Sequence, residues 1–593
     1  MCGIAGIMTS GGKPPENAFL DKMIETLRHR GPDGEGKHVF GNTALLQTRL
    51  AIIDLETGSQ PLLIPSDNPN FPLSLVANGE IYNFVELKEK IIANFKTESD
   101  CEPVLFLYEK KGLNFVKDLR GMYALAIHDS NKKRLILTRD RFGIKPLYYC
   151  YTKIGFVFAS EFQSFMNTGL LERKVRTFAN EELLQIQFTT GRETILEGVY
   201  RVLPGETLVV EDGEIVENLF LDSRPQTTIN SYTDFEAIAK LDAVLEDSVF
   251  VHQRSDVPYG MFLSGGVDSS ALLAMMTRLN DNPVDAFTAG FSGTMVDDER
   301  AHARKVASSM GAIHHEVEFS ESDFWALLPE IIAVIDDPVA DYAILPTYKL
   351  AAEAKLMGIK VVLSGEGADE TFAGYSRYRR ALRPKLLGGR KMRGRGIFSG
   401  LGILKDETKR WRLGIERTEK DLNPKLTKLQ QIQALDYSDW LPNDLMTKLD
   451  RCLMAHGVEG RVPFLDCKVV NFSHQLEDNL KIRNWNGKWI LRAWLHHIFP
   501  ESQAFSRKRG FTVPVGEWIA AKSKQLAPLV SKQNGIVETC NRETVRLLFE
   551  NLSGRDKRLN KAAWSILFYS LWHSYHIMGY RNEGNIFDVL SAS

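Results

Sequence analysis

The chain has 593 residues, of which 44% are hydrophobic and 25% charged, and its formal net charge at pH 7 is -2. This length predicts two or three globular domains, and the near-neutral charge excludes an electrostatic case for nucleic acid or an anionic membrane as a partner. Six scattered cysteines without a CxxC pair exclude a disulfide scaffold and a structural zinc site. Because no signal-peptide pattern and no 18-residue apolar run is present, we expect a cytoplasmic protein.

Residues 1–212 alternate short strand-like segments with single helical stretches at 19–31 and 83–95. Strand-rich sequence with a few helices is typical of an α+β layered domain. The following segment, 213–232, loses helical periodicity and carries Pro, Asp and Asn residues. We therefore interpret it as a linker.

Residues 233–593 change rhythm, because apolar strand-like segments now alternate with helical stretches and the last third is mostly helical and rich in Trp. Strands separated by helices predict a parallel α/β sheet. A run of eight Lys/Arg residues without an acidic one occupies 379–395. Its glycines favour a solvated loop between helices over a nucleic-acid patch.

The segment SGGVDSS, residues 264–270, lies between an apolar strand and a helix. Two glycines allow a tight turn, so that backbone N–H groups and the helix N-terminus converge on one point, which suits a phosphate. A second loop of this kind, SGEGADE at 364–370, follows another apolar strand. Loops at the carboxyl ends of parallel strands form the ligand site of an open α/β sheet. Asp268 and Asp369 are then natural partners for Mg²⁺ on a pyrophosphate.

Several motifs in one order carry a family resemblance. SGGVDSS resembles the pyrophosphate loop of ATP pyrophosphatases. Together with SGEGADETFAGY, TKLDRCLMAHGVEGRVPFLD (447–466) and SRKRGFTVPVGEW (506–518), it resembles the synthetase domain of glutamine-dependent asparagine synthetases. The resemblance implies that ATP and its pyrophosphate bind at Leu263, Ser264, Gly265, Gly266, Asp268, Ser269, Ser364 and Gly365, with Mg²⁺ at Asp268 and Asp369.

The same resemblance assigns two catalytic residues. Glu366 matches the glutamate proposed to handle the proton of attacking ammonia. Lys508 matches the lysine thought to stabilise the negative charge of the adenylate and its tetrahedral intermediate, which is a large catalytic effect where charge develops. The structural alternatives are a position beside a helix N-cap for Glu366 and an exposed basic turn for Lys508.

The chain opens MCGIAGI, and Cys2 could be a buried thiol, a metal ligand or a nucleophile. The N-terminal domain resembles a class II glutamine amidotransferase of the N-terminal nucleophile type. Removal of Met1 would place an α-amine beside the thiol, where it can act as the base. The resemblance implies that Asn78 and Gly79 of NGEIYN stabilise the oxyanion. It also implies a glutamine pocket made by Arg49, Leu50, Ile52, Asn78, Gly79, Glu80 and Asp100.

Taken together, the resemblance implies a four-layer αββα amidotransferase domain (1–212), a linker (213–232) and an ATP-pyrophosphatase-type domain with a helical tail (233–593). The implied reaction converts ATP, L-aspartate and L-glutamine into AMP, pyrophosphate, L-asparagine and L-glutamate, with ammonia passing between the sites. The family is often dimeric, so a homodimer is compatible with the resemblance. The alternatives are amidation of another carboxylate (a cell-wall or surface-polysaccharide precursor, or a peptide), a pure glutaminase and a non-enzymatic regulator.

Overall fold

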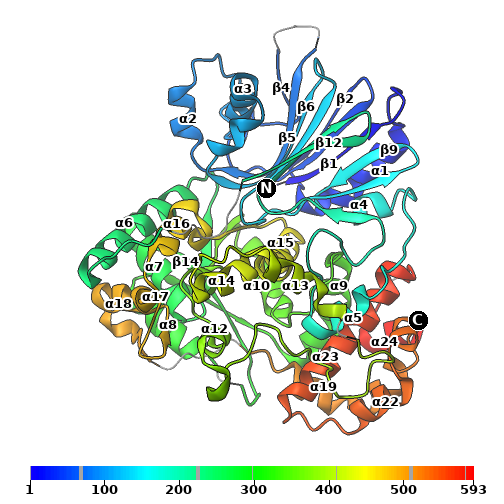
Figure 1. The fold of residues 1–593 in the computed structure, drawn as a ribbon, viewed down its shortest axis with the longest axis vertical. Helices are drawn as coiled ribbons and strands as arrows, with labels where there is room; N and C mark the ends of the chain where they lie inside the picture. Colours follow the sequence, from blue (N-terminus) through cyan, green and yellow to red (C-terminus); the bar gives the residue numbers. More distant parts are fainter. Residues whose placement is uncertain are drawn as a thin grey trace.

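The computed structural model describes residues 2–65, 71–221, 228–296, 298–408, 410–506, 512–580 and 583–592. Two domains lie one above the other in Figure 1, with the strand-rich N-terminal domain over a larger α/β domain whose helical tail ends the chain. None of the described helices is long and apolar enough to cross a membrane.

Two antiparallel six-stranded sheets form the centre of the N-terminal domain. The first sheet has the order β10 (Val199–Arg201), β8 (Tyr148–Thr152), β9 (Gly155–Ala159), β1 (Cys2–Thr9), β3 (Thr43–Arg49), β2 (Gly34–Phe40). The second has the order β12 (Glu214–Phe220), β11 (Glu206–Glu211), β7 (Arg134–Arg139), β6 (Gly121–Asp129), β5 (Leu73–Ile81), β4 (Leu62–Ile64). Their facing side chains form one apolar core, which includes Ile4, Leu45, Val76 and Ala124.

Helices cover both outer faces of this sandwich (Figure 1). Helices α1 (Asn17–Leu27) and α4 (Gln163–Met166) pack on the first sheet, while α2 (Phe84–Lys90) and α3 (Glu102–Lys111) lie over the second. The layers therefore run helix, sheet, sheet, helix, which confirms the predicted αββα architecture. Strand β1 is buried along its whole length, because it lies in the middle of the first sheet with apolar neighbours on both faces.

The second domain is built on a five-stranded parallel sheet of order β15 (Ile313–Glu318), β14 (Asp285–Gly290), β13 (Tyr259–Phe262), β16 (Val361–Leu363), β17 (Glu459–Arg461). It confirms the predicted α/β class. The chain leaves β13 for β14 on one side and later returns to β16 on the other. Ligands bind at such a switch point, outside the carboxyl ends of the strands.

Helices pack on this sheet and continue into the tail. Those of the sheet region are α6 (Asp234–His252), α7 (Val267–Leu279), α8 (Arg300–Ser309), α9 (Glu321–Val334), α10 (Ile344–Leu356), α11 (Ala368–Thr371), α12 (Ser376–Leu382), α15 (Thr447–Met454), α16 (Cys467–Gln475), α17 (Asp478–Lys481) and α18 (Trp489–Ile498). The others are α5 (Ala179–Ile186), α13 (Leu413–Lys420), α14 (Lys428–Leu435), the π-helical η5 (Asp436–Met446), α19 (Val515–Ala521), α20 (Ser523–Val530), α21 (Asn534–Thr539), α22 (Arg542–Glu550), α23 (Lys557–Trp572) and α24 (Ile586–Ala592).

Two features differ from the sequence expectations in detail. The range 213–232, expected to be a linker, contains β12, which pairs with β11 across an Asp212–Gly213 turn with Gly213 at φ +84°. The side chains of β12 are mostly exposed, so its sequence shows no alternation of apolar and polar residues that would predict a strand. The range 379–395 begins in α12 and continues as a loop, and Arg380, Arg383 and Arg390 in it are exposed. Arg393 instead donates to Asp436 at 2.8 Å and is half-buried.

Candidate functional sites

Cys2 begins β1 and is almost fully buried, with 6% of its surface exposed. The register of β1 and β3 places it opposite Arg49. Gln47, two residues earlier on β3, donates from Nε2 to the Cys2 Sγ at 3.0 Å, and the backbone N–H of Leu50 also hydrogen-bonds the thiol. The Cys2 backbone N–H donates to Asn78 Oδ1 at 3.3 Å. The thiol is therefore held among donors at the edge of the domain that faces the second domain.

The electrostatics around this thiol pull in two directions. Burial raises the pKa of Cys2 above its ordinary value, while the Leu50 hydrogen bond and the Arg49 charge lower it without cancelling the effect of burial. A thiol is nucleophilic only as the thiolate. Attack by Cys2 therefore needs a base at the sulfur.

Asn78 and Gly79 lie on β5, next to Cys2. Gly79 has φ +146°, and a Cβ there would lie 2.0 Å from the carbonyl oxygen of Met122 on β6. Only glycine allows β5 and β6 to pair at this point. The Asn78 side chain contacts the first sheet at two points. Its Oδ1 accepts the Cys2 N–H, and its Nδ2 lies 3.5 Å from the hydroxyl of Ser160, which follows β9. The Asn78 amide is thus fixed beside the Cys2 backbone, and Gly79 follows it on the same strand.

Two buried carboxyls lie near this strand, Glu80 on β5 itself and Asp100 in the segment before α3. Burial raises the pKa of Glu80 well above its usual range, and Glu459 and Asp100 raise it further. Burial also raises the pKa of Asp100, although its Oδ2 accepts the Ile81 backbone N–H at 2.7 Å. Arg461 of β17 lies 3.5 Å from Glu80. Buried carboxyls that repel each other favour a cation between them, so a ligand ammonium suits this place.

The remaining members of the predicted glutamine pocket follow on β3 and the next loop. The Arg49 guanidinium donates to the carbonyl oxygens of Ile53 and Asp54, which fixes its direction. Leu50 and Ile52 are buried and pack into an apolar cluster dominated by the second domain. The Ile52 carbonyl accepts the Asp256 N–H at 3.0 Å. This edge of the pocket is therefore supported by the second domain.

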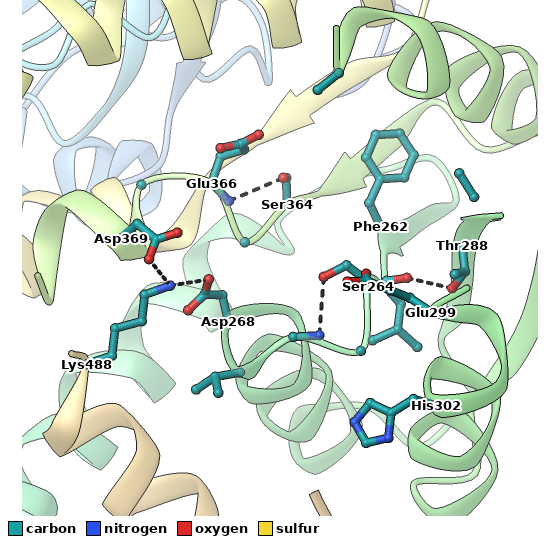
Figure 2. A pocket seen from close by; sticks show the side chains of 18 of the residues that line it. Phe262, Ser264, Asp268, Thr288, Glu299, His302, Ser364, Glu366, Asp369 and Lys488 are labelled. Atoms are coloured by element: carbon teal, nitrogen blue, oxygen red, sulfur yellow. Dashed lines mark hydrogen bonds and ion pairs between the residues drawn. The ribbon is translucent and has the colours of Figure 1, made fainter. Parts of the chain in front are cut away.

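The second site is a cavity of about 410 Å³ at the carboxyl ends of β13, β14 and β16 (Figure 2). Gly265 has φ +68°, and the loop after β13 then leads into α7. The Ser264 Oγ accepts the Gly266 N–H at 3.3 Å and lies 3.1 Å from Ser269 Oγ. Leu263 is buried beneath the loop. A turn with hydroxyls at a helix N-terminus suits an anion such as a phosphate.

The loop after β16 lies directly beside the first one. A Cβ on Gly365 would lie 3.1 Å from Asp268 Cβ, so glycine permits the close approach. The Ser364 Oγ accepts the Glu366 N–H at 3.3 Å, and Glu366 is one of the residues that line the cavity (Figure 2). Lys448 of α15 donates to Glu366 at 3.1 Å. Two separate sequence loops thus form one site.

The two predicted metal ligands face each other across a lysine. Lys488 Nζ lies 2.5 Å from Asp268 and 2.6 Å from Asp369 (Figure 2). The two carboxylates therefore converge on the Lys488 ammonium, and together with the phosphate oxygens of a bound nucleotide they could also hold Mg²⁺. Among the described residues, no group of three or more His, Cys, Asp or Glu side chains could hold a metal ion. Phosphate oxygens would have to complete the coordination.

Comparison with known proteins identifies the family of both domains. The asparagine synthase family model matches residues 240–574, and the glutamine amidotransferase domain model matches residues 1–221. The chain belongs to the asparagine synthase family. It is 30% identical to glutamine-hydrolyzing asparagine synthetase 1 of Bacillus subtilis (strain 168), over 97% of each chain.

Two further relatives show the range of the asparagine synthase family. Asparagine synthetase B of Escherichia coli (strain K12) is 31% identical, over 90% of this chain and 86% of its own. Amidase chyE of Penicillium rubens is 28% identical, over 90% of this chain and 92% of its own. The family assignment thus supports glutamine-dependent amidotransferase chemistry and leaves the acceptor to be argued from the site.

The structure brings together most of the predicted residues of this family member and adds three others. Lys508 lies outside the described residues and stays a prediction. Gln47 could have been found by strand alternation, because it is two residues from Arg49. Lys448 and Lys488 meet partners 82 and 220 positions away, which no local pattern indicates.

Proposed function

We propose that this protein is a glutamine-hydrolysing asparagine synthetase. Cys2 releases ammonia from glutamine, and the second site converts ATP and aspartate into β-aspartyl-AMP, which ammonia then attacks. The observation that supports the proposal is the presence in one chain of two arrangements: a buried thiol beside the Asn78 amide, and a serine- and glycine-bearing loop next to the Glu366–Lys448 pair. Glutamine hydrolysis needs only the first site and carboxylate activation needs only the second, whereas amide synthesis from glutamine needs both.

In the first half-reaction, Cys2 attacks the side-chain amide carbon of glutamine. Removal of Met1 frees the α-amine of Cys2, which takes the thiol proton. A base is needed because burial raises the pKa of this thiol. Asn78 and the Gly79 N–H stabilise the oxyanion. Ammonia leaves, and water hydrolyses the thioester to glutamate. Arg49 pairs with the α-carboxylate of glutamine, and Glu80 and Asp100 with its ammonium.

In the second half-reaction, the aspartate β-carboxylate attacks the α-phosphate of ATP, and pyrophosphate leaves. Ser264, Gly265, Gly266, Ser269, Ser364 and Gly365 bind the phosphates, and Lys488 adds a fixed positive charge beside them. When bound, Mg²⁺ held by Asp268 and Asp369 would neutralise phosphate charge. Glu366 accepts a proton from the attacking ammonia, and Lys508 stabilises the charge of the adenylate and its tetrahedral intermediate. The products are asparagine and AMP.

The Glu366 carboxylate is suited to a proton transfer by its partner. Lys448 is almost fully buried, with 3% of its surface exposed, and its ammonium donates to both Glu366 and Asp341. Its pKa lies above its ordinary range because Glu366, Asp341 and Asp444 outweigh the effect of burial. A charged lysine is therefore held beside the carboxylate to which the proton transfer is assigned.

The acceptor is tested by measuring pyrophosphate release with ATP, glutamine and a panel of carboxylates: aspartate, glutamate, a uronic acid and a short acidic peptide. Aspartate is expected to stimulate release and to yield asparagine in equal amount. If only the uronic acid or the peptide stimulates pyrophosphate release, that compound and not aspartate is the acceptor. Glutamate release without pyrophosphate release from any acceptor would refute amide synthesis.

A second candidate is the same chemistry on a different carboxylate. The relative named as an amidase covers nearly the whole chain at 28% identity, against 30% for the Bacillus asparagine synthetase. Overall similarity therefore separates the two candidates poorly. The panel above decides between them.

A further inference from the structure

Helix α15 (Thr447–Met454) lies between the two sites and touches both. It continues directly from the π-helical segment η5, and all eight of its residues are buried. We infer that Asp450 and Arg451 of α15 are positioning residues for the glutaminase centre, supplied by the synthetase domain. The N-terminal domain therefore contains the nucleophile but not all the groups that hold it. This inference rests only on the glutamine-hydrolysing half of the proposed function.

Asp450 acts on the nucleophile through Arg30. The Asp450 carboxylate accepts two bonds from the Arg30 guanidinium, at 2.7 Å to Nη1 and 3.0 Å to Nη2. The third guanidinium nitrogen, Nε, donates to the carbonyl oxygen of Cys2 at 3.3 Å. A forked arginine–carboxylate pair fixes direction as well as distance. Asp450 thus sets the orientation of the group that holds the Cys2 backbone.

Burial makes this contact a strong constraint. Arg30 is 0% exposed and Asp450 3%, and Glu161 at 2.7 Å is the only other carboxylate that Arg30 contacts among the described residues. The pKa of Asp450 lies below its ordinary value because Arg30, and then Arg451 and Lys145, outweigh the effect of burial. Removing one charge of such a network leaves the guanidinium with an incomplete set of acceptors, so that it reorients.

Arg451 reaches the oxyanion side of the same centre. Its Nη2 donates to the carbonyl oxygen of Ser160 at 3.3 Å, while Nε donates to Asp336 at 2.7 Å. The Ser160 hydroxyl accepts the Ile4 N–H of β1 at 3.0 Å and lies 3.5 Å from the Asn78 amide. Two neighbouring residues of one helix therefore lead to Cys2 and to Asn78 by separate paths.

The same helix carries Lys448, which contacts Glu366 in the synthetase cavity at 3.1 Å. Residues two apart on a helix project on different faces, so Lys448 and Asp450 address different sites. A rotation of α15 that improves one contact must disturb the other. The same position of α15 therefore satisfies both the Asp450–Arg30 contact next to Cys2 and the Lys448–Glu366 contact in the synthetase cavity.

The test replaces the Asp450 charge in the full-length protein. D450N keeps the shape of the side chain, and D450E keeps its charge. D436N is the matched control, because Asp436 is an equally buried carboxylate of the synthetase domain that pairs with Arg377 and Arg393 and not with the N-terminal domain. Glutamate release is measured without ATP or acceptor, together with the rate at which a diazoketone analogue of glutamine alkylates Cys2.

We expect D450N to lower kcat for glutamate release and the alkylation rate at least tenfold, with KM for glutamine within threefold. The loss falls on kcat because Arg49, Glu80 and Asp100, which would bind the amino-acid end, are unchanged. Ammonium-dependent pyrophosphate release, with the acceptor that the panel identifies, should stay within threefold. D450E should recover part of the kcat, and D436N should retain it.

Three results would overturn the inference. These are a D450N kcat within twofold of that of D436N, a raised KM with unchanged kcat, and an equal loss of both activities with a lower thermal midpoint. The last would show a merely structural role. Because glutamate release needs no acceptor, failure of aspartate in the panel leaves this test intact, whereas a wild-type protein without glutaminase activity would refute both the proposed hydrolysis and this inference.

Discussion

At Cys2, burial and nucleophilicity make opposite demands on one side chain. Burial shields the thiol from bulk solvent but raises its pKa, so the thiolate must be made at the moment of attack. The two donors to the sulfur, from Gln47 and Leu50, and the bond from the Cys2 backbone N–H to Asn78 fix the place of Cys2 without supplying a base. The base must therefore come from the substrate or from the amine of Cys2 itself, as the proposed function requires.

Replacement of this residue should separate the two activities. C2A is expected to abolish glutamine-dependent amide formation, because no thioester can form, and to leave ammonium-dependent formation unchanged. A protein that retains Met1 should behave in the same way, since its α-amine is then an amide. The measurement is product formation with glutamine or with ammonium as the nitrogen source. Loss of the ammonium-dependent activity in C2A would contradict the separation of the sites.

Glu370, beside Asp369, should give the protein a pH-dependent stability. It is fully buried, and burial together with the Asp369 charge raises its pKa to about 8. The unfolded chain loses this proton near pH 4.5, whereas the folded protein keeps it until about pH 8. The contribution is therefore fully present below pH 4.5 and is lost as the pH rises through 8, at up to about 1.4 kcal/mol per pH unit. E370Q should lack this slope.

Urea unfolding of wild type and E370Q at pH 5.5, 7 and 8.5 measures the effect. The free energy of unfolding of the wild type should fall relative to that of E370Q with each step. A constant difference would mean that Glu370 is ionised in the folded protein throughout.

At the scale of elements, sequence and structure agree where chemistry is local. The two glycine-bearing loops follow strands β13 and β16 as predicted. A tight strand-to-helix turn depends on residues that are adjacent in the sequence, so a local pattern is enough to predict it. The hairpin of β11 and β12 was not anticipated, although Asp212–Gly213 is a hairpin signal, because the outer strand has no alternating apolar residues. Edge strands of this kind are poorly marked by hydrophobic pattern.

Gly374, in the turn between α11 and α12, should not tolerate a side chain. A Cβ at Gly374 would lie 1.8 Å from Asp369 Oδ1 and 2.0 Å from Lys488 Cε. G374A is therefore expected to push apart the lysine and carboxylate beside the phosphate site and to lower amide formation at least tenfold, with glutaminase activity within twofold. G394A is the control, since its Cβ would meet no atom closer than 3.3 Å. Equal activity of the two variants in pyrophosphate release would contradict this reading of the turn.

At the scale of the whole molecule, the contacts that matter most join residues hundreds of positions apart. Arg30 and Asp450 are separated by 420 positions, and Lys488 and Asp268 by 220. Family motifs indicated which segments carry chemistry, but which side chains face each other depends on how two domains pack. That packing depends on buried surface shared by both domains, such as the cluster of Leu50 and Ile52 with α6 and α7. A single sequence contains no direct record of it.

The buried contacts between the domains should also shelter ammonia. Lys145 of the N-terminal domain donates to the Gly460 carbonyl of β17 at 3.3 Å, and both residues are buried, as are Arg461 and Asp450 nearby. Ammonia released at Cys2 and kept from water is not protonated and stays nucleophilic, whereas free ammonia at pH 7 is almost all ammonium. With amide-labelled ¹⁵N-glutamine and an equal concentration of unlabelled ammonium at pH 7, the product should therefore keep nearly all of its ¹⁵N. Label diluted in proportion to the added ammonium would show that ammonia equilibrates with solvent between the sites.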